Sequence, residues 1–574
     1  MDFKRLRGMN GPTNTQVGAP IIVDDPDAAN WDASCDTLVV GLGLAGASAA
    51  MRSSELGQDT IVVERFTGGG ASELSGGIVY AGGTHVQSEL GVEDSPENMF
   101  RYLVQETGGL IREDVLRKFC DDSPGLIRWL EKYGVVFGGP LAPRKTSYPM
   151  RNDFLYVSGN ELVPSYRATA TPAARGHRAK PTYKSGEPYG GQFIMHAMKK
   201  AVFGAPNIRT FTHSTARRLI IDASGAVVGA EVWQIPAGSA AARKHARYYE
   251  MGKKLFFGLI GLVPWLWRKT AEIEDAHARP IRIRARKGVV LAAGGFMVNR
   301  PMVEQLAPDY RGVLPLGTMA DDGSGIQLGI SVGGTCSKLE HVSAWRFINP
   351  PYAWVKGIVV SPDGERYDNE ELYGARLGKD ICERGGGHGY LIVDAAIQSK
   401  ATAEVKAGGM LGFQKYPVTF SFLTAPKAAT IEVLARKVGM SPERLAGEVE
   451  TYNRAIERGE PDPKGKSDEN RSVIKTGPFY SIDLSWGQKF TPLMGLTMGG
   501  LDVDQDSGAV VNEQEREIGG LYAAGRSAVG IPSNRYISGL SLADCVWAGW
   551  RAAEGAATRS SQEKQREPLA DRAG

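Results

Sequence analysis

The stretch "NRYISGLSLAD", residues 534–544, places two hydroxyl side chains, Tyr536 and Ser538, beside a glycine turn that leads into an expected helix. A phenol has an ordinary pKa near 10. It becomes a usable general base where a hydrogen bond or a positive helix end stabilises the phenolate. The pair therefore has the chemistry needed to move a proton. A structural interpretation is also open, because loop tyrosines are commonly half-buried and Ser538 could cap the helix that begins near Leu540.

The elements that must position such a site begin with a strand–glycine–helix unit. The buried-strand run "DTLVV" is followed at once by "GLGLAG" and by a helix of small residues. In this pattern Gly41 permits the tight turn, Gly43 lets a pyrophosphate approach the backbone, and Gly46 lets helix and strand pack closely. A second strand, "TIVVE", ends in Glu64, whose carboxylate is placed to accept from a ribose hydroxyl. This order predicts a dinucleotide-binding domain with the pyrophosphate at the helix N-terminus.

A second glycine-rich segment distinguishes FAD from NAD as the dinucleotide. "GGGASELSGGIVYAGGT", residues 68–84, resembles the corresponding segment of the fumarate reductase and succinate dehydrogenase flavoprotein family. Further similar pieces are "GAVVGAEV", "KGVVLAAGGF", "DDGSGIQLGISVGG", "TMGGLDVD" and "GGLYAAGRSA". Together the pieces cover most of residues 35–555. The resemblance implies an α/β fold, with a Rossmann-like FAD-binding domain of the GR2 type and an inserted α+β capping domain.

The same resemblance implies how FAD is held. Some relatives attach the flavin through a histidine in the second glycine-rich segment. Here no histidine precedes His85 in that segment, so we expect FAD to bind non-covalently. Ser541 and Leu542 are expected to offer backbone N–H groups to the flavin pyrimidine edge. The expected cofactor-binding residues are Gly41, Gly43, Ala45, Gly46, Glu64, Arg65, Gly70, Ala71, Ser72, Ser75, Gly76, Gly77, Ala293, Gly294, Asp322, Gly525, Arg526, Ser541 and Leu542.

The chain has 574 residues, which is too long for one compact core and predicts two or three domains. We expect an N-terminal lead-in at 1–34, the FAD-binding domain at 35–337 and 490–557, a capping substrate domain at 338–489, and a disordered polar tail at 558–574. Within the first part, "SPGLIRWLEKYG" is expected to form a helix with Ser123 as N-cap, Pro124 at the first position and Gly134 as stop.

An apolar insertion interrupts the FAD-binding domain at about 236–280. Within it, "KKLFFGLIGLVPWLWRKT", residues 253–270, carries an uncharged run at 255–267 between two basic pairs. The run is shorter than the about 20 residues that span a bilayer. Its tryptophans and flanking basic residues favour a segment that lies in a membrane interface, giving peripheral contact with the inner face of the cell membrane. Packing on its own domain or on a partner subunit is the other interpretation.

Composition narrows the class of protein. The hydrophobic share of 42% and charged share of 23% are typical of a soluble globular protein, and the net charge of +3 gives no nucleic-acid footprint. The 72 glycines are clustered, which indicates backbone that closely approaches a large ligand. The five cysteines form no CxxC pair, so no metal site or disulfide framework is expected. The basic N-terminus has no apolar core behind it, which favours a cytoplasmic protein.

Fumarate reductases, the dicarboxylate branch of the resembled family, clamp carboxylates with arginines and histidines. Their central arginine lies four residues after a glutamate, and here the fourth residue after Glu370 is Gly374. A histidine that the branch places before the "GG" of the closing segment is Thr497 here. Arg535 is retained, but its spacing to Asp544 is one residue longer than in that branch. These departures remove the clamp and proton donor of fumarate chemistry.

Tyrosines stand where the clamp is missing. Tyr373 occupies the position before the absent arginine, and Tyr536 begins "YISGLSLAD". With the lead-in "DDPDAANWD", this combination resembles the 3-ketosteroid dehydrogenases, and most closely the Δ4-(5α) enzymes. The resemblance implies that Tyr536 takes a proton from carbon 4 of a 3-ketosteroid and that a hydride leaves carbon 5 for the flavin. Tyr373 with Ser538 would polarise the ketone or relay the proton. Exchange of the base and oxyanion-donor roles between the two tyrosines stays open.

Three alternatives remain: a 3-ketosteroid Δ1-dehydrogenase, a fumarate or enone reductase, and a non-catalytic flavoprotein recruited to a membrane. The Δ1 enzymes carry a proline- and glycine-rich run after their tyrosine, which this chain lacks. The tyrosine pair disfavours the non-catalytic alternative. The chain has no CxxCH haem motif and no iron–sulfur cysteines, so electrons are expected to pass to an external acceptor, quinone-like or other.

Overall fold

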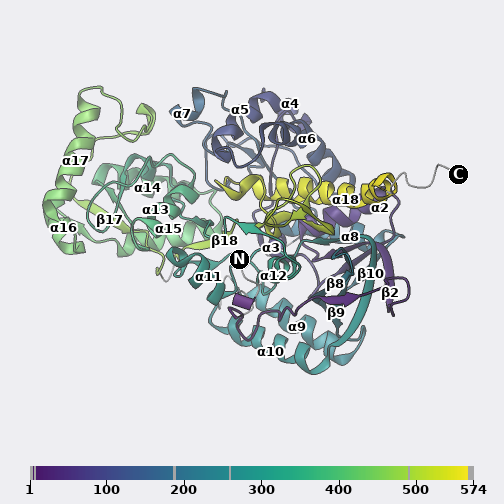
Figure 1. Cartoon of the computed structure of the whole chain (residues 1–574). Helices are drawn as coiled ribbons and strands as arrows, with labels where there is room; N and C mark the ends of the chain where they lie inside the picture. The colour runs from purple at the N-terminus through teal and green to yellow at the C-terminus, as the bar shows by residue number, and fades with distance from the viewer. Residues whose placement is uncertain (1–3, 6–7, 185–188, 257–259, 489–490, 567–574) are drawn as a thin grey trace.

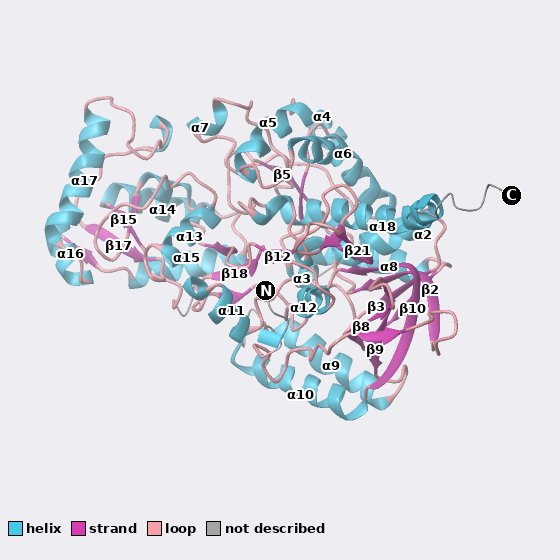
Figure 2. Ribbon diagram, viewed as in Figure 1, coloured by secondary structure: helices cyan, strands magenta, loops and turns pink. Residues whose placement is uncertain are grey.

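The computed structural model describes residues 4–566 apart from 6–7, 185–188, 257–259 and 489–490. Its largest described sheet has nine strands in the order β1–β8–β9–β10–β2–β3–β7, with β21 added on β10 and β20 on β21. The strands are β1 (Ile21–Val23), β2 (Ala33–Val40), β3 (Thr60–Val63), β7 (Ile208–Phe211), β8 (Ser214–Asp222), β9 (Val227–Gln234), β10 (Arg279–Leu291), β20 (Ala509–Val511) and β21 (Glu517–Ala523). Figure 2 shows many of them grouped at the right, with helices above and below.

The centre of this sheet is parallel. Strand β2 pairs with β3 and with β10, β3 pairs with β7, and β10 pairs with β21, all in parallel. The runs Leu38–Val40 and Ile61–Val63 are buried on both faces, as apolar strands of a covered parallel sheet are. Strand β10 also pairs antiparallel with β9 through its first residues, which ties the β8–β9 hairpin to the parallel centre. The expected α/β fold is confirmed.

Two helices, α2 (Leu44–Glu55) and α18 (Leu540–Arg566), pack against each other over the sheet, and Figure 1 shows them together. An added Cβ at Gly549 of α18 would lie 2.6 Å from the carbonyl oxygen of Ala45, so glycine permits this close approach. Helix α18 runs through 558–566, which we expected to be disordered. Gln, Glu, Lys and Arg are good helix formers, and they extend a helix that its buried part has already nucleated. Residues 567–574 lie outside the described part of the chain.

A pair of helices, α5 (Pro96–Thr107) and α6 (Glu113–Lys132), packs together beside α18. The expected helix start at Ser123 is wrong, because α6 runs continuously and Pro124 lies inside it. The Ser123 hydroxyl is buried and accepts from the Gly82 N–H at 3.2 Å. An interior proline removes one backbone hydrogen bond and costs about 3 kcal/mol. The buried apolar face of α6 offsets that cost.

The apolar insertion forms a helical hairpin of α9 (Ala240–Leu255) and α10 (Val263–His277). Tyr249 of α9 is buried and stacks on Phe66 with ring centroids 4.1 Å apart, and Leu266 of α10 is buried too. One face of the hairpin therefore packs on its own domain. Within the described residues, no helix combines the length and hydropathy needed to cross a membrane.

A second group of elements lies at the left of Figure 1 and comes from within residues 338–489. Its four-stranded sheet has the order β14–β15–β17–β16. The elements are β14 (Ile358–Val360), α13 (Gly374–Glu383), β15 (Tyr390–Val393), α14 (Ala395–Ala407), α15 (Gly412–Thr424), β16 (Lys427–Ala428), α16 (Ile431–Val438), α17 (Pro442–Glu457) and β17 (Phe479–Asp483). This composition is of the α+β kind expected for the capping domain, while the domain boundaries stay a prediction.

A buried ion network ties together the segments of this second group. Glu370 accepts from the Arg366 guanidinium at 2.7 Å and lies 2.9 Å from the Lys466 ammonium. Arg366 also contacts Asp462 at 2.7 Å. Lys466 and Arg366 lower the pKa of Glu370 to about 2 against the opposing effect of burial. Glu370 is thus a structural charge here.

Candidate active site

The glycine turn after β2 opens the N-terminus of α2 to a ligand. Gly41 has φ +101°, and an added Cβ would lie 2.6 Å from the carbonyl oxygen of the residue that follows β10. Gly43 is the N-cap of α2, and it carries no side chain to cap the helix. The Leu44 N–H donates to the Ser72 hydroxyl at 3.1 Å. The free N–H groups and the helix dipole make this a place for an anion such as pyrophosphate.

Glu64 follows β3 and lies beside that turn. One carboxylate oxygen accepts from the Leu42 N–H at 2.7 Å and the other accepts from the Phe66 N–H at 2.8 Å. Burial raises the pKa of Glu64, and the two amides oppose that rise. Because each carboxylate oxygen has a second lone pair, Glu64 retains the capacity to accept from a ribose hydroxyl.

Arg65, the next residue, is held between two carboxylates. Its guanidinium lies 2.9 Å from Glu274 of α10 and 2.9 Å from Asp322. Asp322 also accepts from the Thr15 N–H at 2.7 Å, so its carboxylate is turned toward this ion pair. The neighbouring residue Asp321, and not Asp322, lines the nearby cavity. Asp321 was not among the cofactor-binding residues expected from the sequence.

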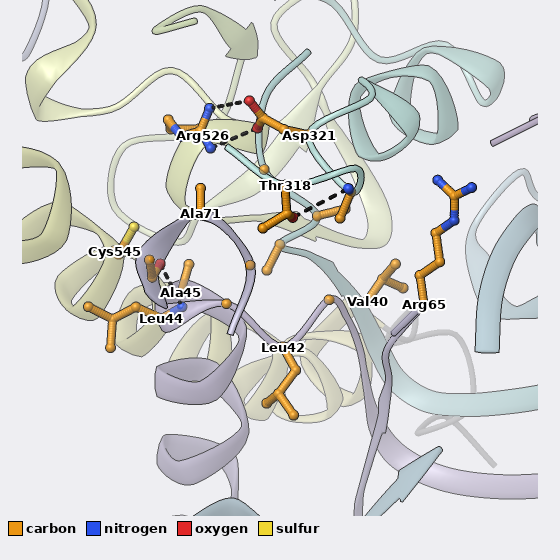
Figure 3. A pocket seen from close by; sticks show the side chains of 18 of the residues that line it. Val40, Leu42, Leu44, Ala45, Arg65, Ala71, Thr318, Asp321, Arg526 and Cys545 are labelled. Carbon is orange, nitrogen blue, oxygen red and sulfur yellow. Dashed lines mark hydrogen bonds and ion pairs between the residues drawn. The ribbon is translucent and has the colours of Figure 1, made fainter. Parts of the chain in front are cut away.

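A single cavity brings most of the expected cofactor residues together (Figure 3). The expected residues that line it are Gly41, Gly43, Ala45, Glu64, Arg65, Gly70, Ala71, Ser72, Ser75, Ala293, Gly294, Arg526, Ser541 and Leu542. Gly46, Gly76, Gly77, Asp322 and Gly525 are not among its lining residues. Several of these glycines serve close packing, since a Cβ at Gly46 would collide with the Gly41 carbonyl. The open N-terminus of α2 fits the pyrophosphate of FAD, and the buried Glu64 fits its ribose. No histidine lines the described cavity.

An ion pair missed by the sequence analysis lies at the edge of this cavity. Asp321 and Arg526 are 2.7 Å apart, and Figure 3 shows their side chains facing each other. Asp321 also accepts from the Gly295 N–H at 2.8 Å, which fixes its orientation. Asp321 and Asp322 are adjacent in "DDGSG", and no local pattern in the sequence indicates which of them faces the cavity. Further unselected lining residues include Thr15, Thr318, Trp345 and Cys545.

Tyr536 lines the same cavity and is the only one of the three expected catalytic residues to do so. Its ring stacks on Trp345, at the end of β13 (Val342–Trp345), with centroids 5.5 Å apart. Burial raises the pKa of Tyr536, while the Gly539 amide and the charge of Arg526 oppose the rise. These two groups are the ones that favour its phenolate form.

Tyr373 and Ser538 lie close to Tyr536. Tyr373 is buried at the N-cap of α13, and its ring centroid is 6.0 Å from that of Tyr536. Ser538 accepts from the Tyr156 hydroxyl at 2.8 Å. Burial raises the pKa of both Tyr156 and Tyr373, and hydrogen bonding to Ser538 opposes the rise in each. Ser538 therefore connects two tyrosines.

Tyr156 belongs to this hydroxyl cluster and was not selected from the sequence. It lies in β5 (Leu155–Tyr156), which joins β6 (Gly176–Arg178) and β4 (Ile78–Tyr80) in a small antiparallel sheet. Strand β4 lies within the second glycine-rich segment, and the sheet places Tyr156 against the loop that carries Ser538. The surrounding letters "FLYVSG" hold no motif that would have indicated this contact.

The positions that carry the fumarate clamp have other roles here. Thr497 is fully buried, and its hydroxyl accepts from the Phe296 N–H at 3.0 Å. Arg535 is exposed and donates to the Gln105 carbonyl oxygen at 3.3 Å. Gly374 begins α13. These three described residues form no arginine–histidine clamp of the fumarate reductase kind.

The parallel sheet, the glycine turn and the lined cavity are those of a dinucleotide-binding flavoprotein, and comparison with known families agrees. The model of the FAD-binding-domain family matches residues 36–542, and the chain belongs to this family of flavoproteins. The protein is an FAD-dependent oxidoreductase. When bound, FAD supplies a two-electron hydride acceptor at the cavity. The expectation of FAD as cofactor is confirmed.

Individual relatives narrow the comparison. The chain is 36% identical to a 3-oxo-5-alpha-steroid 4-dehydrogenase of Comamonas testosteroni, over 89% of this chain and 96% of the relative. It is 25% identical to a 3-oxosteroid 1-dehydrogenase of Mycolicibacterium smegmatis, over 87% and 93%. The crystal structure of a 3-ketosteroid Δ4-(5α)-dehydrogenase of Rhodococcus jostii in complex with 4-androstene-3,17-dione superimposes with a TM-score of 0.77 at 28% identity, over 94% and 100%. The resemblance to 3-ketosteroid dehydrogenases is confirmed.

Proposed function

We propose that this protein is an FAD-dependent dehydrogenase that introduces the 4,5 double bond into ring A of 5α-3-ketosteroids. The observation that carries the proposal is the group of tyrosines beside the cofactor cavity, in a chain 36% identical to a 3-oxo-5-alpha-steroid 4-dehydrogenase. A flat apolar ketone gives charged side chains little to bind, and aromatic rings with a few hydroxyls suit it. The lower identity of 25% to a 1-dehydrogenase favours position 4 over position 1.

In this proposal Tyr536 is the general base. Its phenolate oxygen takes the proton from carbon 4, and the C–H electron pair becomes the new double bond as a hydride leaves carbon 5. The 3-keto group acidifies the C–H bond at carbon 4. Tyr373 with Ser538 polarises the ketone oxygen, which strengthens that effect. The place of Tyr536 on the cavity wall supports giving it the role that contacts the reacting carbon.

Turnover requires an electron acceptor from outside the chain. Each desaturation would transfer one hydride, which is two electrons and one proton, to FAD, and the two electrons must be passed on before a second steroid can react. We propose a quinone-like acceptor that reoxidises FAD after product formation. Reoxidation of the steroid-reduced enzyme by a soluble quinone would support this class of acceptor. A reduced flavin that persists with the quinone and discharges to another acceptor class would contradict it.

We also propose that the α9–α10 hairpin contacts a membrane surface. Leu262 is 52% exposed and Trp265 is 47% exposed, and Lys254 and Arg268 are exposed nearby. Apolar tips with flanking basic residues are typical of interfacial segments on anionic lipid. The buried face of the hairpin packs on its own domain, so the contact would involve only the outer residues. Residues 257–259, which were part of the expected membrane segment, lie outside the described part.

Product analysis tests the main proposal. Purified enzyme is incubated with 5α-androstane-3,17-dione and an artificial electron acceptor, and the product is identified by mass spectrometry and NMR. The account predicts loss of two hydrogens and a vinyl proton at carbon 4. A double bond between carbons 1 and 2 would move the assignment to Δ1-dehydrogenation, and the absence of any desaturated product would contradict the proposed function.

A further inference from the structure

A second cavity shares Tyr536 with the cofactor cavity. It has a volume of about 150 Å³ and is lined by Tyr536, Glu106, Asn160 and Arg535 among others. That volume exceeds the about 10–15 Å³ that one water molecule needs, so the cavity has room for several waters. Tyr536 is the one residue that lines both this cavity and the cofactor cavity. The candidate base therefore borders both the cofactor cavity and a polar space.

Glu106 is the buried acid of this second cavity. It lies near the end of α5 and is 1% exposed. One carboxylate oxygen accepts from the Tyr102 hydroxyl at 2.7 Å and from the Asn160 amide at 2.7 Å. The other oxygen, Oε2, is buried and has no hydrogen-bond partner among the described residues. A buried carboxylate oxygen without a partner is costly, so it indicates a role with a mobile group such as water.

The cavity connects Glu106 to the surface. Arg535 is exposed at its wall, and the side chains of Lys379 and Glu383 are 44% and 35% exposed. His341 and Arg376 line the same space. These groups are polar and reach solvent, whereas the cofactor cavity combines many glycine, alanine and leucine residues with the charged Glu64, Asp321 and Arg526.

The charges that surround Glu106 act in both directions. Burial raises the pKa of Glu106 and the nearby Glu161 adds to the rise, while Tyr102, Asn160 and the charge of Arg535 oppose it. Tyr166 and Lys145 also lie within electrostatic range of this carboxylate. Glu106 is therefore a more basic carboxylate than one in water, which suits a group that takes up a proton and gives it away.

We propose that the second cavity is the exit route for the substrate proton and that Glu106 positions the water that carries it. The inference rests on the proposed function, in which Tyr536 takes a proton from the steroid. The Tyr536 O–H then donates to a water in the cavity, that water passes a proton to Glu106, and Glu106 releases it to solvent past Arg535. No electrons move along this route, because the hydride leaves separately for FAD. Glu106 does not touch the reacting atoms: it holds the water and takes the proton only after Tyr536 has released it.

Single-turnover measurements on the FAD-loaded enzyme test this route. Glu106→Gln is mixed anaerobically with a 5α-3-ketosteroid, and flavin bleaching and proton release to an indicator dye are followed together. We expect the rate of proton release to fall at least about tenfold, toward the about 10²–10⁴-fold that a proton-transfer group typically contributes. Flavin bleaching, which precedes the exit step, should slow less, and steroid affinity should stay within about twofold of the wild type. Formate added to Glu106→Ala should restore part of the rate, and Glu106→Asp should retain most of it.

Glu161→Gln is the matched control. Glu161 is an equally buried carboxylate, and its oxygens accept from the Tyr80 hydroxyl at 2.8 Å and from the Gly159 N–H at 2.9 Å. It does not line the second cavity, and its charge is the smallest of the effects named above on the pKa of Glu106, so the rates of Glu161→Gln should stay near those of the wild type. Wild-type rates in Glu106→Gln, or formate that leaves Glu106→Ala unchanged, would overturn the route. A wild-type enzyme that no ketosteroid bleaches would instead overturn the proposed function.

Discussion

At the scale of single residues, the hydroxyl of Tyr536 is the atom on which the proposed chemistry depends. Tyr536→Phe keeps the ring that stacks on Trp345 and removes only the O–H group. We expect turnover to fall by about 10²–10⁴-fold while FAD stays bound, because loss of a general base slows proton transfer without opening the cofactor cavity. Steady-state rates with a 5α-3-ketosteroid, together with the flavin absorbance per protein, measure the two quantities.

Tyr133→Phe is the control for that variant. Tyr133 lies at the end of α6, and its hydroxyl donates to Glu55 at 2.7 Å, away from both cavities. Its loss should leave turnover unchanged. Normal turnover in Tyr536→Phe would transfer the role of base to Tyr373 or Ser538.

Residue-level prediction from the sequence worked where a backbone constraint produces a motif. The fingerprint glycines and Glu64 could be located because a tight turn and a helix start permit few residue types. Asp321 and Tyr156 could not, because their contacts with Arg526 and Ser538 join segments far apart in the chain. Such contacts depend on tertiary packing and leave no local spacing to read.

At the scale of elements, the α9–α10 hairpin gives a prediction about location. Replacing Leu262 and Trp265 by serine removes its most exposed apolar side chains and leaves the buried Tyr249 and Leu266 in place. We expect binding to anionic vesicles of phosphatidylglycerol to weaken several-fold, because each of the two substitutions removes apolar area from the membrane contact. Vesicle co-sedimentation measures the change.

Helix α15 provides the comparison for the hairpin variant. It also exposes apolar side chains, with Tyr416 75% and Leu423 80% exposed. Replacing these two by serine should leave vesicle binding unchanged if the hairpin is the contact. Vesicle binding that is lost with the α15 variant and kept with the hairpin variant would contradict the proposal.

Helices and strands could be predicted from the sequence where the local residue pattern and the tertiary packing agree. The strand–turn–helix unit of β2 and α2 was placed correctly, because its local signals agree with its buried position. The start expected at Ser123 failed because Pro124 is also tolerated inside a helix whose apolar face is well buried. The end of α18 was misplaced for a related reason, since a polar segment extends a helix that packing has nucleated.

At the scale of the whole molecule, two buried acids predict how stability depends on pH. The pKa of Glu370 is lowered to about 2 by Lys466 and Arg366, and the pKa of Glu274 is lowered to about 2 by Arg65 and His245. Their folded pKa values lie below the ordinary value of 4.5, so the unfolded chain binds more protons in this interval. Each acid therefore stabilises the fold at neutral pH, by about 3 kcal/mol. That stability is lost as pH falls from about 4.5 toward 2.

Urea unfolding at several pH values checks this dependence. The free energy of unfolding of the wild type should fall steeply between pH 4.5 and 2. Glu370→Gln should lose about 3–5 kcal/mol at pH 7, because Arg366 and Lys466 are left buried without their partner, and should show a shallower fall with acid. Glu513→Gln, at an exposed position, should match the wild type. A Glu370→Gln variant as stable as the wild type at pH 7 would contradict the assignment.

The arrangement of the whole molecule also determines which features could be predicted from the sequence alone. Family motifs spread over most of the chain indicated the fold class and the cofactor. The second cavity forms where the end of α5, the start of α13 and residues 532–536 meet, and no single segment of the sequence indicates that they do. The proton route could therefore be inferred only from the folded arrangement.

The central claim is tested most directly by anaerobic titration of the oxidised enzyme with two steroids, followed through the flavin absorbance at about 450 nm. One is 5α-androstane-3,17-dione, and the other is its Δ4 counterpart, which already carries the double bond. The account predicts that the saturated steroid bleaches the flavin and that the Δ4 steroid does not. Bleaching by the Δ4 steroid, or by neither steroid, would contradict it.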